Sequence, residues 1–229
     1  MGDAFRFQIA RHYQIARQSA NCYTDTALKT LTIIGTVHLD PRGRAMLKTA
    51  LDQLRPAYIT VDVSNYAVAF RQCRGGELAA RLAAFRRADG TLPASLEAVE
   101  AQIAVPFEAQ TVAEWCSAYE LVGDNDDSRS RLEMFEKELM SPENLAYLST
   151  ESFPSLPVQV GRQWEKARVS WRQLRAGAPC DERIAGIIRR LLMQPGESLC
   201  HITGWEHVAP LAELLADHSP TLRLLDEFA

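Results

Sequence analysis

Two histidines that lie far apart in the sequence follow the same short pattern. Residues 35–38 and 204–207 each read G-x-x-H, and each is followed by an aliphatic residue, a residue of any type and a proline. A neutral imidazole is a common metal ligand, and it also works as an acid or base near neutral pH. One such match occurs easily by chance, but two with the same flanking residues indicate a repeated device. We therefore take His38 and His207 as the first candidate site residues.

The elements around the two patterns place both histidines at the ends of strands. The apolar run 31–34 reads as a short buried strand, a second apolar run precedes His207, and a helical pattern follows each G-x-x-H. In open α/β sheets, ligands bind at the carboxyl ends of parallel strands. We therefore expect the two rings to lie close together. The alternative is that each histidine caps a helix or fills a polar gap in its turn.

Acidic residues follow two further predicted strands. Asp62 lies in the apolar run 58–63, where a carboxylate is costly unless it pairs, binds a metal or lies at the strand end. The alternative is that Asp62 caps the next helix. Asp124 ends the run 119–124, and Asp126 and Asp127 follow it. These three residues either bind a hard cation or cap the helix after them. The spacing does not fit a calcium-binding loop.

Composition limits the classes of protein to which the chain can belong. Its 229 residues are 47% hydrophobic and 24% charged, which suits one α/β domain over residues 1–229. A net charge of −4 argues against nucleic acid as the main partner. We expect no membrane-spanning segment and no signal peptide, because no long uninterrupted apolar run is present. The five cysteines are scattered and form no C-x-x-C pair, which argues against a disulfide framework and a cysteine-pair zinc site. The expected compartment is the cytoplasm.

The whole pattern predicts an α/β fold. We expect a single domain with a mixed or mainly parallel sheet flanked by helices, with the 58–63 strand beside the first. A helical insertion at about 65–115 should form a flap beside the site. Further elements are expected as helices at 5–20, 41–54, 130–139, 142–148, 158–174 and 181–193, and as an edge strand within 221–228.

Together these features resemble the TraB/PrgY–Tiki superfamily, which also has erythromycin-esterase-like and haem-uptake-related branches. The resemblance covers most of the chain, from about residue 31 to residue 215. The two G-x-x-H patterns match those of the family, and Asp62 stands where the family usually has an acid, most often Glu. Residues 181–183 resemble the family's Glu-Arg pair, which puts Arg183 near the site. The chain departs from the pattern at Ala67 and Asn125, where arginines are typical.

The resemblance implies a metal-dependent hydrolase without membrane segments, of the peptidase or esterase kind. His38, His207 and Asp62 would hold a divalent cation (Mn²⁺, Co²⁺ or Zn²⁺), with Gly35 and Gly204 opening the two turns at this cofactor. Two imidazoles and a carboxylate leave coordination positions open for water.

Two further residues have expected roles in such a hydrolase. Glu206 would act as the base, and Arg183 would stabilise a developing oxyanion. We expect a peptide or small molecule as the partner, with a homodimer as a further assembly. The alternative is a non-catalytic module that binds a peptide, a small molecule or haem in the same cleft. A nucleotide binder is less well supported, because no G-x-G-x-x-G or Walker-type loop is present.

Overall fold

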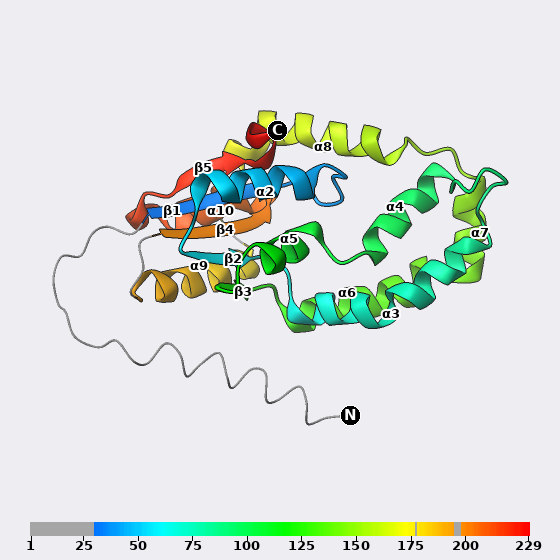
Figure 1. Ribbon diagram of the computed structural model, residues 1–229, viewed down its shortest axis with the longest axis horizontal. Helices are drawn as coiled ribbons and strands as arrows, with labels where there is room; N and C mark the ends of the chain where they lie inside the picture. The colour runs from blue at the N-terminus through cyan, green and yellow to red at the C-terminus, as the bar shows by residue number, and fades with distance from the viewer. Residues whose placement is uncertain (1–29, 177, 195–197) are drawn as a thin grey trace, which may run out of the picture.

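The computed structural model describes residues 30–176, 178–194 and 198–229 (Figure 1). Their strands form a five-stranded sheet with the order β3-β2-β4-β1-β5, and all neighbours run parallel. The strands are β1 (Thr30–Thr36), β2 (Tyr58–Val61), β3 (Tyr119–Leu121), β4 (Ser198–Gly204) and β5 (Thr221–Leu224). Helices flank the sheet, so the predicted α/β fold with a mainly parallel sheet is confirmed. The helix predicted at 5–20 lies outside the described residues.

The order of the strands differs from the prediction. The sequence predicts β2 beside β1, because successive strands are most often neighbours. The prediction is wrong, since β4 lies between them and pairs with both. β1 and β4 are therefore inner strands, and Ile33, Ile34 and Ile202 have no exposed surface, as expected for parallel strands covered on both faces. The predicted edge strand is present as β5, beside β1.

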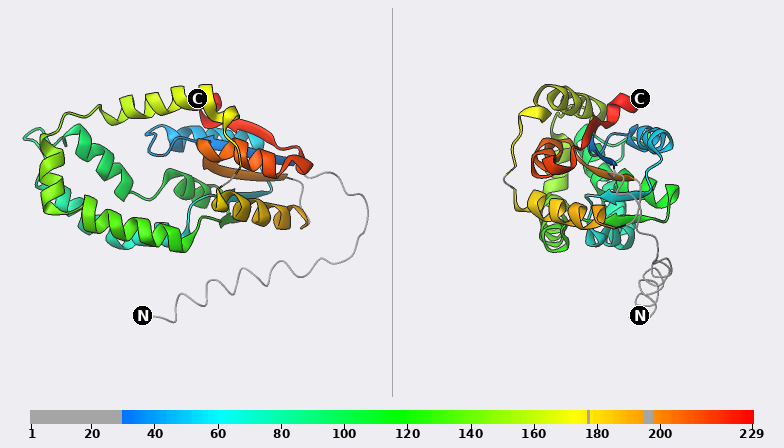
Figure 2. Two further views of the ribbon diagram at one scale, coloured as in Figure 1. Left: turned by 180° about the vertical axis from the view of Figure 1, so that it is seen from behind. Right: turned by 90° about the vertical axis from the view of Figure 1, so that its left-hand side faces the viewer.

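Helices cover the two faces of the sheet in pairs. α2 (Gly43–Leu54) and α5 (Phe107–Trp115) pack together on one face, and α9 (Pro179–Leu192) and α10 (Trp205–Leu214) pack together on the other. The end-on view in Figure 2 shows this arrangement. α9 is amphipathic: Ile184, Ala185 and Ile188 recur at helical spacing and are fully buried. The described residues also contain short 3₁₀ helices at Trp171–Gln173 (η3), Ala216–His218 (η4) and Leu225–Phe228 (η5).

A group of helices extends from the sheet and has its own apolar core. We call it the helical lobe. It comprises α3 (Asn65–Ala83), α4 (Ala94–Ile103), α6 (Asn125–Met134), the π-helix η2 (Phe135–Leu139) and α7 (Pro142–Thr150). Its buried cluster is separate from the cluster under the sheet, and contains Leu78, Leu82, Leu92, Leu96, Val99, Ile103, Met140 and Leu145.

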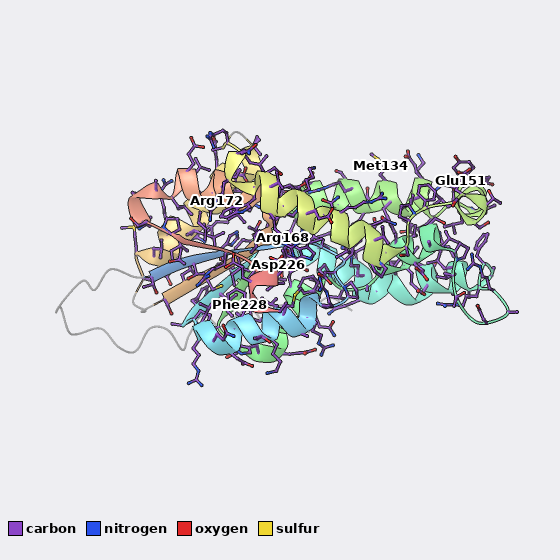
Figure 3. All side chains as sticks on the ribbon, turned by 90° about the horizontal axis from the view of Figure 1, so that it is seen from above. Met134, Glu151, Arg168, Arg172, Asp226 and Phe228 are labelled. Atoms are coloured by element: carbon purple, nitrogen blue, oxygen red, sulfur yellow. The ribbon has the colours of Figure 1, made fainter. Side chains whose placement is uncertain are left out.

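The lobe differs from the predicted insertion at 65–115 in two ways. α5 packs on α2 and on the sheet, so residues 107–115 belong to the α/β layers. α6, η2 and α7 join the lobe instead, although they follow β3 in sequence. α8 (Leu156–Ser170) then runs from the lobe back along the sheet, and Arg168 pairs with Asp226 at 2.6 Å near the C-terminus (Figure 3). Among the described residues, no helix is long and apolar enough to cross a membrane.

Candidate functional site

The turn after β1 holds His38 in a fixed backbone conformation. The next residue, Leu39, has a φ of 67°, a left-handed value that costs a non-glycine residue about 1–3 kcal/mol. The buried carboxylate of Asp40 accepts hydrogen bonds from the backbone N–H of Arg42 at 2.9 Å and from the indole N–H of Trp164 at 2.6 Å. Burial raises the pKa of Asp40, but these bonds and the Arg42 charge outweigh it and lower that pKa. The turn is thereby tied to α8.

The turn after β4 brings His207 next to His38. Gly204 ends β4 and caps α10, and a Cβ atom at Gly204 would lie 3.1 Å from Nε2 of His38 and 3.6 Å from Cδ2 of His207. The sum of these two distances is an upper limit for the separation of the two ring atoms. It is well inside the limit of about 10 Å for a shared site. The two histidines therefore lie side by side, as the repeated pattern predicts: His38 turns its Cδ2–Nε2 edge toward Gly204, and His207 approaches it with Cδ2.

This pair lies at the topological switch point of the sheet. The chain leaves β1 for α2 on one face and leaves the adjacent β4 for α10 on the opposite face. The two connections lead to opposite faces of the sheet, and a cavity lined by residues 36–39 and 204–206 lies at the carboxyl ends of these strands. Such a position is the usual ligand site of open α/β sheets.

A buried glutamate on α5 orients the ring of His38. Nδ1 of His38 lies 2.8 Å from Oε1 of Glu108, and the hydroxyl of Thr36 donates to the same oxygen at 2.8 Å. The Glu108 side chain is 2% exposed, whereas that of His38 is 58% exposed. One edge of the ring therefore meets the buried acid, while more than half of the side chain remains exposed.

The charges of His38 and Glu108 favour each other. Desolvation lowers the pKa of His38, but the charge and hydrogen bond of Glu108 outweigh it, so the pKa lies above its ordinary value of 6.5. The charges of Asp62 and Glu206 add to this rise. Burial raises the pKa of Glu108, but the charge of His38 and the hydrogen bonds outweigh it and lower that pKa. The two groups therefore form an ion pair at mildly acidic pH.

His207 is held in the same manner from the other face. Nδ1 of His207 lies 2.6 Å from Oδ1 of Asp181, whose side chain is 3% exposed and belongs to the first turn of α9. Each histidine thus has its own buried carboxylate at Nδ1. A neutral imidazole that donates Nδ1–H to a carboxylate keeps the lone pair of Nε2 for a ligand, and metal-binding histidines commonly have this arrangement.

Asp62 lies at the carboxyl end of β2 and accepts a hydrogen bond from the hydroxyl of Thr203 at 3.0 Å. Ser64, rather than Asp62, caps α3, because its side chain accepts a hydrogen bond from the backbone N–H of Ala67. The alternative prediction, that Asp62 caps the next helix, is therefore wrong. The charge of Asp62 acts on His38, which places its carboxylate within electrostatic reach of the histidine pair.

A third histidine, His201, lies below this group inside β4. It is fully buried, and its Nδ1 lies 2.9 Å from the hydroxyl of Thr60 on β2. Burial lowers the pKa of His201 to about 4, and the ring is neutral at physiological pH. Its Nε2 has no hydrogen-bond partner within the described part of the chain.

A cavity of about 280 Å³ opens beside His38. Its walls come from the turns after β1 and β4 and from α8, which contributes the amides of Gln159 and Gln163. Glu206, in the first turn of α10, also lines it and is exposed. The predicted base therefore lies in the same cavity as His38.

Two predicted site residues have other contacts. Arg183 donates to the carbonyl oxygen of Val122 at 2.7 Å, and its Nε lies 3.6 Å from Oδ2 of Asp124. These contacts hold it at the end of β3, which is separated from β4 by β2. At Gly35 a Cβ atom would lie 2.6 Å from Cγ2 of Val208. Gly35 therefore lets α10 pack closely on β1.

The acidic run after β3 is a helix cap. The side chain of Asp124 accepts hydrogen bonds from the backbone N–H groups of Asp126 at 2.9 Å and Asp127 at 3.0 Å. The sequence leaves open a cation site or a helix cap here, and the structure has Asp124 as the cap of α6.

One group of three potential metal ligands stands out within the ranges that the structure describes. Cys180, Asp181 and His207 each offer an atom, and these atoms all lie within 4.8 Å of one another. Only His207 belongs to the predicted set of ligands. His38 and Asp62 are outside this group.

Sequence reasoning missed Glu108 and Asp181 as partners of the histidines. Both are acids in the first turn of a helix, where a carboxylate usually stabilises the helix dipole in solvent. Glu108 follows the apolar residues Val105, Pro106 and Phe107, which is a signal of burial. Asp181 is followed directly by Glu182 and Arg183, and its only such signal is the helical spacing that puts Ile184 and Ala185 on the same face.

Comparisons with protein-family models, curated proteins and solved structures found no match to this chain.

Proposed function

We propose that this protein is a metal-dependent hydrolase that acts on a peptide or an ester. The observation that carries the proposal is the pair of imidazoles at the switch point. Each is fixed at Nδ1 by a buried carboxylate, and both rings lie against Gly204, His38 through Nε2 and Cδ2 and His207 through Cδ2. Two adjacent imidazoles, each held at Nδ1 so that Nε2 keeps its lone pair, are suited to bind a divalent cation.

The residues present fit such a cation. His38 and His207 would supply two nitrogen ligands, and Asp62 would supply a carboxylate oxygen, since its charge acts on His38. Two imidazoles and one carboxylate suit Mn²⁺, Co²⁺ or Zn²⁺ and leave room for water. A cation bound there lowers the pKa of a coordinated water and polarises a carbonyl group.

The protein's own groups would position the substrate and move the proton. Glu206 lines the cavity with its carboxylate exposed, and can accept a proton from a nucleophilic water. The amides of Gln159 and Gln163 can hydrogen-bond a peptide or ester carbonyl. At about 280 Å³ the cavity is at the lower end of small-molecule sites, and it suits a short substrate segment.

A non-catalytic binding module for a peptide or small molecule is the second candidate. The observation in its favour is the position of Arg183, which contacts Val122 and Asp124 at the end of β3. The group expected to stabilise a developing oxyanion is therefore engaged elsewhere. A module of this kind would use the same cavity without the hydrolytic step.

Calorimetry with Mn²⁺, Co²⁺ and Zn²⁺ on protein without a histidine tag, followed by a panel of peptide and ester substrates, tests the proposal. We expect a cation to bind the wild-type protein between His38 and His207, a place that we call the cleft, and His38→Ala to abolish the binding of Mn²⁺ there. The matched control is His218→Ala, since His218 is partly exposed and lies beside Asp217 on η4. Cation binding without hydrolysis would favour the binding module. Absence of any binding by the wild type would end the metal-dependent proposal.

A further inference from the structure

The side of the histidine pair that faces α9 contains a second group of potential ligands. Cys180 and Asp181 are adjacent in the first turn of α9, and the sulfur of Cys180, a carboxylate oxygen of Asp181 and a ring nitrogen of His207 lie within 4.8 Å of one another. The cysteine spacing in the sequence did not indicate this group, because zinc patterns are recognised by cysteine pairs. Here the fold supplies the remaining ligands from α9 and α10.

The chemistry of this group differs from that of the cleft. Nitrogen and oxygen atoms line the cleft, whereas the α9 group adds a sulfur. Thiolate ligands select thiophilic ions such as Zn²⁺, and oxygen-rich sites favour Mn²⁺. Burial and the negative charges of Asp181 and Asp62 raise the pKa of the Cys180 thiol, and the same charges attract a cation. A bound cation deprotonates a coordinating thiol.

A second, independent feature of the same region is the unpartnered nitrogen of His201. Its ring is fully buried in β4, and its Nε2 lacks a hydrogen-bond partner in residues 30–176, 178–194 and 198–229. The charges of Asp62 and His207 both act on His201, so its ring lies within electrostatic reach of one of the three potential ligands, His207. A buried polar atom without a partner costs about 1–3 kcal/mol, and a water or cation within reach of Nε2 would offset that cost.

We propose that Cys180, Asp181 and His207 form a second cation site, selective for Zn²⁺, on the α9 side of the histidine pair. The existence of this site is independent of the proposed hydrolase. Its consequence rests on the proposed function, because His207 serves both sites. Zn²⁺ bound to Cys180 engages His207 and weakens the binding of Mn²⁺ in the cleft, so that Zn²⁺ acts as an inhibitor.

Cobalt spectroscopy tests the site directly, because a thiolate bound to Co²⁺ gives a charge-transfer band in the near ultraviolet that nitrogen and oxygen ligands do not give. We expect one equivalent of Co²⁺ to produce this band in reduced wild-type protein under argon, and Zn²⁺ to remove it. Cys180→Ser should lack the band. Cys116→Ser is the matched control, since Cys116 is also a partly buried free thiol, and it should retain the band. No band in the wild type, or a band that survives in Cys180→Ser, overturns the proposal.

Alkylation of the wild-type protein provides a test that needs no variant. We expect one equivalent of Zn²⁺ to slow iodoacetamide labelling of Cys180 at least tenfold, as measured by peptide mapping, while labelling of Cys116 is unchanged. Equal protection of both thiols, or of neither, contradicts the site.

The coupling to the cleft is measured as Mn²⁺ affinity with and without one equivalent of Zn²⁺. At least a tenfold weakening is expected, and an unchanged affinity overturns the shared role of His207. His38→Ala should lose Mn²⁺ binding yet keep the Co²⁺–thiolate band. If the wild type binds no Mn²⁺ but gives the band, the hydrolase proposal fails while the thiolate site stands.

Discussion

Replacing Glu108 with glutamine isolates the charge of the His38–Glu108 pair. The amide has nearly the same shape and can still accept the hydrogen bond of Thr36, but it carries no charge for His38. The lowered pKa of Glu108 means that its contribution to stability is present above its ordinary pKa of 4.5 and is lost as the pH falls. The raised pKa of His38 gives a contribution to stability with the opposite pH dependence. Its contribution is fully present below 6.5 and is lost as the pH rises through the folded-state value.

The cost of Glu108→Gln should therefore be largest between these two values. A hydrogen bond to a charged buried group contributes about 1.5–3 kcal/mol. Since 58% of the His38 side chain is exposed, solvent screening reduces this to roughly 1–2 kcal/mol. Well above the pKa of His38 the pair is no longer doubly charged, and the cost should fall below about 1 kcal/mol.

Urea denaturation at about pH 5.5 and about pH 8.5 measures the loss of unfolding free energy under each condition. NMR titration of the histidine rings follows the pKa of His38 directly. Glu114→Gln is the control, because Glu114 pairs with Arg44 on the surface and should change stability little at either pH. A loss for Glu108→Gln that does not depend on pH, or a His38 pKa unchanged by the substitution, would refute the reasoning.

Three further outcomes are expected. Asp40→Ala removes the buried acceptor of an indole N–H and of a guanidinium, and should lower the free energy of unfolding by about 2–4 kcal/mol; Asp52→Ala, which removes an exposed acceptor of the same kind, should cost much less in the same urea titration. Gly204→Ala should weaken cation binding about tenfold or more in calorimetry, because the new Cβ meets Nε2 of His38 at 3.1 Å; Gly186→Ala has open space around it and should leave binding unchanged. Cation affinity, measured by calorimetry against pH, should fall on acidification through the raised pKa of His38, and a flat profile would argue against an imidazole ligand.

The sequence was informative where a local pattern decides the structure. An apolar run, a glycine, a histidine and a helix, found twice, place His38 and His207 at the ends of strands, and parallel pairing then brings them together. The strand order could not be obtained in this way. Hydrophobic runs alone do not say that the last long strand, β4, inserts between β1 and β2.

The partners of the two histidines depend on the tertiary structure. Glu108 reaches His38 only because α5 packs on α2, and Asp181 reaches His207 only because α9 packs on α10. Each resembles an ordinary acid in a first helical turn until the packing buries it. Arg183 is predicted near the site because of its place at the start of α9. Its side chain instead donates a hydrogen bond to the carbonyl oxygen of Val122.

Crystals grown with Mn²⁺ and examined by anomalous diffraction test the central claim most directly. We predict a manganese peak at bonding distance from Nε2 of both His38 and His207, with Nδ1 of each ring still on Glu108 and Asp181. A peak that contacts neither Nε2 atom, or no peak near Gly204 at a saturating concentration of Mn²⁺, would contradict the proposed cation site.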